Sequence, residues 1–423
     1  MKKYDLIVVG GGLTGVAAAV AAGREGLSVL LVEQSGSLGG AINNNLVYPF
    51  MRYWTDDPNG ERKWLSAGIF KEIFQNTAKL CKPGSSIDFS PEHMKVALDK
   101  LVLDAGVELL FHTTLFKAII DGRNVKSVLV ATKAGEMELK ADFFIDATGD
   151  GDLLAFAGCE FQLGRESDGL CQPMTTCFRV ANVHPDRFGP EGKKSLRPIL
   201  NELYQKAKEE GRINNPREDI LWFRGAALGE TIGHFNTTRV VKLDPTDPMQ
   251  VSKAEVMARA QVLELLEVLK EIPAFADATL VSIATAIGVR ESRKLKGVHI
   301  LTAQELKDCT RFEDSIALGN YDIDIHNPEG SGTSHYYFAP GDYYTIPYRC
   351  LLPREFDNLL TGGRCISTTH EAQASIRIMP ICATTGQAAG TAAAVAQKTG
   401  KNVHNVDIKA VQELLRQNGA AID

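Results

Sequence analysis

The sequence has little that marks a metal-binding or nucleic-acid-binding protein. Its eight cysteines form no C-x-x-C pair, so structural zinc and iron–sulfur ligation have no support, and we predict no metal site. Scattered, unpaired cysteines are typical of a reducing compartment. The formal net charge of −6 is spread along the chain without long runs of one sign, which argues against a nucleic-acid partner.

Long apolar stretches are also missing. The run Leu6–Val9 is too short for the apolar region of a signal peptide, and the alanine- and glycine-rich segment 386–397 is too short to span a bilayer. We therefore expect a cytoplasmic protein with no membrane span. A chain of 423 residues, 44% hydrophobic and 23% charged, favours two or three globular domains.

The segment YDLIVVGGGLTGVAAAVAAGREGLSVLLVE, residues 4–33, combines the features of a nucleotide-binding turn. Gly10, Gly12 and Gly15 follow an apolar strand and open an alanine-rich helix. In this spacing one glycine makes the turn, one lets the backbone approach a pyrophosphate, and one lets the helix pack on the strand. Glu33 ends the next strand, where a carboxylate can accept both hydroxyls of a ribose. The pattern predicts a dinucleotide site.

Three later features favour FAD over NAD. Gly39 and Gly40 follow the second strand at once and let the backbone pass close to a flavin or its ribityl chain. DATGDGD, residues 146–152, follows a short apolar strand, at the strand end where ligands sit in open α/β sheets. LLTGGRC, residues 359–365, repeats the pattern of an apolar strand followed by glycines. A helix beginning near Pro380 can then place its positive end against the flavin.

The middle of the chain differs in composition from both ends. It is more polar, richer in tryptophan, tyrosine and proline, and contains two expected amphipathic helices, at 193–211 and 252–271. We predict an α/β fold: a Rossmann-like FAD-binding domain, with a parallel sheet and a three-stranded β-meander, plus an inserted mixed α+β substrate domain. The FAD-binding domain is expected to be discontinuous, over 1–158 and 348–423, with the insert at 159–347.

Taken together, these motifs resemble the FAD-dependent oxidoreductases of the glutathione-reductase-like flavoprotein superfamily, with a distant similarity to succinate- and fumarate-type flavoproteins. The segments IGVRESRKLKG and YYTIPYRCLLP also belong to the similarity. The resemblance implies an FAD domain with an inserted substrate domain. Carried over by position, it implies FAD contacts from Gly10, Gly12, Gly15, Glu33, Gln34, Gly39, Gly40, Thr148, Gly149, Asp152, Gly363, Arg364 and Arg377.

One departure from the resemblance concerns how the flavin is attached. Succinate-type relatives often carry a histidine just after the second glycine pair for covalent attachment, whereas this chain reads GGAINNN there. We therefore predict non-covalent FAD. No cysteine pair lies beside Gly39 and Gly40 either, so disulfide-reductase chemistry is not supported.

The candidate catalytic residues are Arg290, His335 and His370. Arg290 and Arg293 could hold a carboxylate in a fork, although a structural ion pair with Glu291 is an equally simple interpretation. His335 lies among aromatics and glycines and could accept a proton, or could belong to a surface hairpin. His370 follows the last glycine-containing strand, close to the expected ring.

The favoured hypothesis is an oxidoreductase that transfers a hydride between FAD and a small polar, possibly carboxylated, metabolite. The alternatives are a flavin monooxygenase and a non-catalytic or electron-transfer flavoprotein subunit. TGGRCIS lacks the aspartate that monooxygenases usually show beside the last glycine strand. We expect a small-molecule substrate; the residues carry no signal for the electron acceptor or the oligomeric state.

Overall fold

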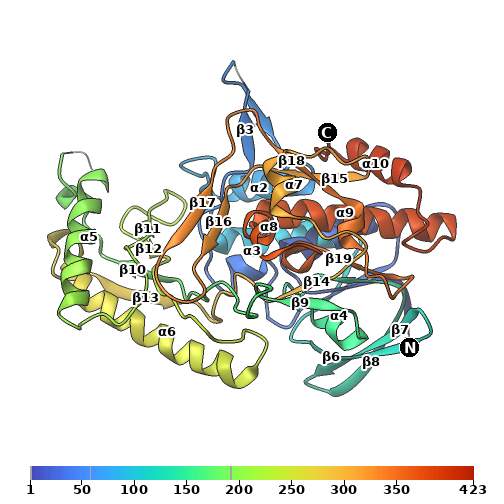
Figure 1. Cartoon of the computed structure of the whole chain (residues 1–423), viewed down its shortest axis with the longest axis horizontal. Coiled ribbons are helices and arrows are strands. Elements are labelled where there is room, and N and C mark those ends of the chain that lie inside the picture. The colour runs from blue at the N-terminus through green and yellow to red at the C-terminus, as the bar shows by residue number, and fades with distance from the viewer. Residues whose placement is uncertain (1, 58, 191–192) are drawn as a thin grey trace.

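The computed structural model describes residues 2–57, 59–190 and 193–423 (Figure 1). Its first elements are the predicted strand, helix and strand: β1 (Lys3–Val9), α1 (Leu13–Arg24) and β2 (Val29–Val32). Residues 13–22 of α1 are buried on every side, which explains why this helix consists almost entirely of alanine, valine and glycine rather than showing a polar face.

A seven-stranded sheet forms the centre of the nucleotide-binding part. Its main order is β5-β2-β1-β8-β7-β6, and the seventh strand, β19, pairs with the last residues of β8 outside this order. β8 serves two roles: its first half pairs antiparallel with β7, and its second half runs parallel between β1 and β19. The short strand expected at 143–146 is therefore the end of a longer one. The strands not yet bounded are β5 (Glu108–Leu110), β6 (Thr114–Asp121), β7 (Asn124–Thr132), β8 (Gly135–Asp146) and β19 (Leu359–Thr361).

The helix α9 (Met379–Thr399) packs directly on α1. Two glycines make this contact close: an added Cβ would lie 2.1 Å from the carbonyl oxygen of Thr14 at Gly386, and 2.1 Å from that of Ala18 at Gly390. Gly386 contacts Thr14 and Gly390 contacts Ala18, so residue numbers increase in the same direction along both helices. The two helices therefore run parallel. Met379 lies seven residues before Gly386, so α9 begins about 10 Å before its contact with Thr14 and extends past the N-terminal end of α1.

A second unit carries its own core and lies to one side of the first (Figure 1). Its sheet has the order β11-β12-β10-β13 and packs against two helices. Phe178, Trp222 and Phe235 stack on one face of this sheet, in a core separate from that of α1 and α9. The elements are β10 (Phe178–Ala181), α5 (Lys193–Glu209), β11 (Trp222–Phe223), β12 (Gly233–Phe235), α6 (Pro248–Leu269) and β13 (Thr279–Ile283).

The later part of the expected insert packs differently. Leu301, Ile316 and Ile346 belong to the same core as α1 and α9, not to the core of the second unit. The division at residue 347 stays a prediction; by packing, the predicted insert contains one separate unit, at 178–283, followed by a segment joined to the first unit. That segment holds β14 (Arg293–Leu295), α7 (Ala303–Lys307), β15 (Ser315–Gly319), β16 (Ile323–His326), β17 (Thr333–Tyr336) and β18 (Tyr344–Pro347).

The α/β fold class predicted from the sequence is confirmed. Among the residues described, no helix is long and apolar enough to cross a membrane. The remaining elements are β3 (Trp54–Asp56), β4 (Arg62–Trp64), α2 (Ile69–Leu80), α3 (Pro91–Asp104), α4 (Asp152–Ala157), β9 (Phe161–Leu163), α8 (His370–Ile376) and α10 (Ile408–Gln417).

The α1–α9 contact yields a stability prediction. Gly390→Ala should lower the free energy of unfolding by about 1–3 kcal/mol, although alanine favours helices, because its methyl group collides with the Ala18 carbonyl and separates the helices. The control is Gly330→Ala, where nothing lies within 4 Å of the added Cβ. Urea unfolding of both variants measures the difference, and equal midpoints would contradict the packing argument.

Candidate functional site

A cavity of about 470 Å³ opens at the carboxyl ends of the parallel strands. Residues that follow β1, β2, β8 and β19 all line it, together with residues before β6 and at the start of α9. In open α/β sheets this edge is where ligands bind. The predicted site residues that line it are Gly10, Gly12, Glu33, Gln34, Gly39, Gly40, Thr148, Gly149, Asp152, Arg290, Arg364 and Arg377.

The two glycine loops lie against each other. The backbone N–H of Gly39 donates to the carbonyl oxygen of Gly11 at 2.8 Å, and Gly12 begins α1 with no side-chain cap. A Cβ added at Gly12 would meet nothing closer than Gly40 Cα, at 4.0 Å, so the space above this turn is open. An uncapped helix N-terminus beside an open space is a suitable place for a pyrophosphate.

Glu33 is buried at the end of β2. Its carboxylate accepts backbone N–H groups from Gly11 at 2.6 Å and from Ser35 at 2.7 Å. These bonds fix the carboxylate and leave it further lone pairs, which a ribose hydroxyl could use. Gln34, Thr113 and Leu115 line the cavity beside it, so this end suits an adenosine.

The loop after β8 is held by a buried carboxylate. Asp146 accepts the backbone N–H groups of Thr148 at 3.0 Å and Leu154 at 2.8 Å, and burial raises the pKa of Asp146 to about 6. Thr148 in turn accepts the N–H of Asp152. Asp146 is the one acid of the DATGDGD motif that does not line the cavity, and its hydrogen bonds hold the loop that forms the cavity wall.

Arg364 joins this loop to the segment after β19. It donates to the Asp150 carboxylate at 2.9 Å, while its Nη1 atom is buried with no hydrogen-bond partner among the described residues. Burial by itself lowers the pKa of Arg364, but the Asp150 charge raises it above the usual value. Since a buried guanidinium donor is costly to leave unpaired, this atom suits an anionic or carbonyl group of a ligand in the cavity.

The N-terminus of α9 faces the other end of the cavity. Ile378, Met379 and Cys382 line it there, and the helix has no side-chain cap and no acidic residue in its first turn. Its dipole therefore favours negative charge at this end. The Gly12 space, the unpaired Arg364 donor and the two uncapped helices together fit FAD, with the adenosine near Glu33 and the flavin near Met379.

The loop after Gly40 anchors the segment that carries Arg290. Asn45 donates to the carbonyl oxygens of Ala286 and Ile287 at 2.9 and 3.0 Å, and the Asn44 carbonyl accepts the N–H of Ala286 at 3.0 Å. These contacts, across more than 240 residues of sequence, hold segment 286–290 in the cavity wall.

Arg290 is partly buried, and its hydrogen-bond partners are neutral acceptors. Its Nη1 donates to the carbonyl oxygen of Pro173, at 2.6 Å, and to the Thr175 hydroxyl. Burial lowers the pKa of Arg290 to about 9, and the positive charges of Arg377 and other arginines add to the effect. No carboxylate pairs with it among the described residues, so it is a cation with donors to spare beside the cavity.

Two expectations about Arg290 are corrected by the structure. Glu291 is not its partner, because that carboxylate pairs with Lys294 at 2.5 Å and with His370 at 2.7 Å. Arg293 does not form a fork with it either, because Arg293 donates to Asp152 at 2.9 Å. The arginine that shares the cavity wall with Arg290 is Arg377.

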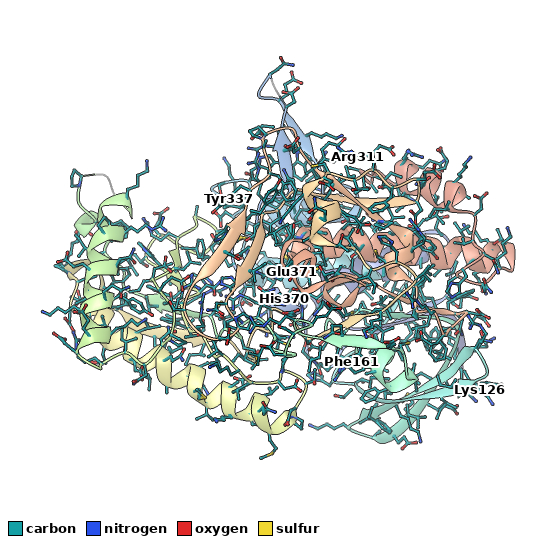
Figure 2. The ribbon with its side chains drawn as sticks, viewed as in Figure 1. Lys126, Phe161, Arg311, Tyr337, His370 and Glu371 are labelled. Carbon is teal, nitrogen blue, oxygen red and sulfur yellow. The ribbon has the colours of Figure 1, made fainter. Side chains whose placement is uncertain are left out.

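Neither predicted histidine base lines the cavity. His370, the first residue of α8, is buried and bound to Glu291, whereas its neighbour Glu371, labelled beside it in Figure 2, is exposed. His335 pairs with Asp322 at 2.6 Å and stacks on exposed Tyr337, at the outer edge in Figure 2. Both histidines already have partners elsewhere, so the structure does not support either as the base.

Two of the predicted glycines also lie outside the lining. A Cβ at Gly15 would be 1.8 Å from the Gly10 carbonyl oxygen, and one at Gly363 would be 2.4 Å from the Thr14 hydroxyl. Both glycines permit close packing around α1 rather than facing the cavity.

Several lining residues were missed from the sequence. They come from the loop after Gly40, from the second unit and the segment before it, and from the start of α9: Asn44, Asn45, Thr175, Cys177, Asn236, Met379 and Cys382. Burial raises the pKa of the thiols of Cys177 and Cys382 to about 12, so both are protonated at neutral pH. In the part of the chain that the structure describes, no cluster of three metal-ligating side chains occurs.

This fold and site define a dinucleotide-binding flavoprotein. A family model described as FAD dependent oxidoreductase matches residues 5–415, and the chain belongs to that family. Its cofactor is FAD, as predicted. No curated protein matches the chain.

Solved structures share the fold at low identity. A p-nitrophenol 4-monooxygenase from Pseudomonas putida is 12% identical, with 98% of this chain and 84% of that chain covered and a TM-score of 0.50. A geranylgeranyl bacteriochlorophyll reductase-like protein from Thermoplasma acidophilum is also 12% identical, covers 99% and 83%, and has a TM-score of 0.48. The likeness to the p-nitrophenol 4-monooxygenase supports the predicted Rossmann-like FAD-binding fold. These likenesses do not single out the succinate and fumarate type.

The glycine turn gives a paired prediction about FAD. Gly12→Ala should fold with unchanged stability but retain less FAD, because its methyl group occupies the open space where the pyrophosphate is expected. Gly15→Ala should instead destabilise the apoprotein, because its Cβ collides with Gly10. Flavin absorbance per protein and apoprotein melting temperature separate the two effects. Full FAD binding by Gly12→Ala would place the pyrophosphate elsewhere.

The histidines give a second prediction. His335→Ala should leave flavin reduction unchanged, since its ring lies outside the cavity. His370→Ala should lower the melting temperature, because it removes one partner of buried Glu291. Stopped-flow flavin reduction and thermal melts check both. A His370→Ala protein that melts normally, binds FAD and no longer reduces it would restore the catalytic role.

Proposed function

We propose that this protein transfers a hydride between a small polar metabolite and non-covalently bound FAD. The observation that carries the proposal is the single cavity, which connects the dinucleotide loops around Gly12 with Arg290 and the start of α9. A substrate placed beside Arg290 would share that cavity with the flavin end of the cofactor.

FAD, when bound, supplies the hydride acceptor or donor. The residues of the chain supply the rest. Arg290 offers a fixed positive charge for an anionic group of the substrate, and Thr175 and Asn236 add polar lining beside it. The α9 N-terminus stabilises negative charge that develops at its end of the cavity. We assign the accompanying proton to water, because the nearby thiols are protonated and the histidines lie elsewhere.

The finer resemblance to succinate- and fumarate-type flavoproteins stays part of this proposal. It is supported by the motifs at both ends of the chain and by an arginine in the substrate end of the cavity.

A flavin monooxygenase is the second candidate. The fold shared with the p-nitrophenol 4-monooxygenase supports it, as do lining thiols that offer no base for dehydrogenation. Rapid oxygen consumption with NADPH would favour this candidate. If no donor bleaches the flavin, a non-catalytic or electron-transfer subunit is the remaining interpretation.

The central test is an anaerobic screen of metabolites against the purified holoenzyme. We expect a small polar metabolite to bleach the flavin absorbance, and acid precipitation to release the yellow cofactor into the supernatant. Colour retained on the precipitated protein would refute non-covalent attachment. A protein purified without flavin that takes up none when offered FAD would overturn the proposal.

Arg290 is tested with the donor found in that screen. Arg290→Ala should bind FAD normally but lose about ten- to one-hundred-fold in the second-order rate of flavin reduction, since it removes a charge-assisted hydrogen bond. Arg290→Lys keeps the charge and should lose less. An unchanged rate in Arg290→Ala would exclude a contact with the substrate.

A further inference from the structure

We propose that Arg290 and Arg377 together bind one carboxylate of the substrate, and that Asp324 makes this a site for a monoanion. The inference rests on the proposed function in one respect: the substrate is taken to occupy the cavity that both arginines line.

Four arginines lie close enough for their charges to interact: Arg290, Arg377, Arg217 and Arg239. Arg290 is influenced by the charges of Arg377, Arg217 and Arg239. Each of these three has its own carboxylate: Arg217 lies 3.2 Å from Asp219, Arg239 lies 3.2 Å from Glu218, and Arg377 lies 3.3 Å from Asp324. Within the described residues, Arg290 alone of the four forms no ion pair, so the group carries one uncompensated positive charge.

Some N–H donors of Arg290 and Arg377 remain unused. Arg290 uses Nη1 for the Pro173 carbonyl and the Thr175 hydroxyl. Arg377 uses Nη2 for the carbonyl and carboxylate oxygens of Asp324, both at 3.3 Å, and its Nε is buried with no partner among the described residues. A guanidinium has five N–H donors, so both side chains keep donors for a ligand in the cavity. Unpaired buried donors and a net charge of one sign favour an anion.

Asp324, on β16, is the carboxylate that pairs with Arg377. Its Oδ2 accepts from the Tyr321 hydroxyl at 3.0 Å and lies 3.5 Å from Nε2 of His326. Burial by itself raises the pKa of Asp324, but the hydrogen bond with His326 and the charge of Arg377 hold it well below the usual range. Asp324 is therefore ionised, and it neutralises one of the two arginines at the cavity.

The tautomer of His326 follows from its other neighbour. Arg239 Nη2 lies 3.0 Å from Nδ1, and because a guanidinium can only donate, Nδ1 must accept. In the neutral ring the proton then resides on Nε2, which faces Asp324. Burial lowers the pKa of His326 to about 3, with the Arg290 charge contributing, so the ring is neutral. Asp324 thus receives an N–H from His326 without losing its charge.

This arrangement specifies the ligand class. Arg290 and Arg377 carry two positive charges, and Asp324 neutralises one of them, so the pair attracts a ligand with one negative charge. A second negative charge on the ligand would have to be buried without compensation. Arg364, which lines the same cavity, is already neutralised by Asp150 at 2.9 Å. Arg290 and Arg377 line the cavity together with Ile287, Met379 and Asn236 of the second unit.

The test uses three probes with one carbon skeleton: malonamide, malonamate and malonate, with charges of zero, minus one and minus two. Binding to the FAD-loaded protein is measured by isothermal titration and by perturbation of the flavin spectrum. We expect malonamate to bind about ten- to one-hundred-fold tighter than malonamide, and malonate no tighter than malonamate. Arg290→Ala and Arg377→Ala should each remove most of the preference for malonamate over malonamide.

Asp324→Asn gives the decisive comparison. It keeps the shape of the side chain and removes its negative charge. The ratio of the affinity for malonate to the affinity for malonamate should therefore rise about tenfold. The matched control is Asp314→Asn, because Asp314 pairs with Arg349 at 2.9 Å outside the cavity lining and should leave all three affinities unchanged.

The outcomes separate this inference from the proposed function. Equal binding of malonamide and malonamate by the native holoenzyme would overturn the carboxylate site. Loss of FAD from Arg377→Ala, with carboxylate binding intact in the residual holoenzyme, would overturn it by assigning Arg377 to the cofactor. Charge-selective binding in a protein whose flavin no metabolite bleaches would support the site and refute the hydride transfer.

Discussion

The contact between α1 and α9 determines where everything else in the site can lie. Gly386 and Gly390 let one helix approach the backbone of the other, at Thr14 and Ala18, closely enough that a single methyl group would collide. The two helices come from opposite ends of the chain and run parallel, so their positive ends point to the same side of the sheet. α9 starts past the N-terminal end of α1, on the same side of the sheet. One helix end is thus available for the pyrophosphate and the other for the flavin.

The second constraint is electrostatic. The arginines of the cavity wall are partly buried, and they differ in how their charges are neutralised: Arg364 is held by Asp150, Arg377 by Asp324, and Arg290 by neutral oxygens only. A buried charge without a partner raises the energy of the unliganded protein. Ligand binding relieves that cost, so the placement of these side chains indicates where anionic groups belong. The contacts of Asn44 and Asn45 with segment 286–287 tie the substrate end of the cavity to the cofactor loops.

Most residues that local patterns predict as cofactor contacts line one cavity in the structure. The strand–glycine–helix sequence around Gly10 and Gly12, the acid at Glu33 and the strand ends at Thr148 and Arg364 all depend on neighbours close in sequence, or on the general rule about strand ends. The same reasoning failed for His335 and His370. Both lie near aromatic or glycine-rich motifs, yet ion pairs with Asp322 and Glu291 hold them outside the cavity lining.

The sequence by itself determined the dinucleotide turn, the α/β class and the FAD-dependent family, because these rest on local backbone geometry and short-range spacing. Only the tertiary structure decided which charges meet. Arg290 and Arg377 are 87 positions apart and Asp324 lies between them on a third element, so no periodicity connects them. Their grouping arises from the packing of β16, α8 and the 286–290 segment around one cavity. Whether an arginine is paired or free depends on distances in space, which neighbouring residues in the chain do not encode.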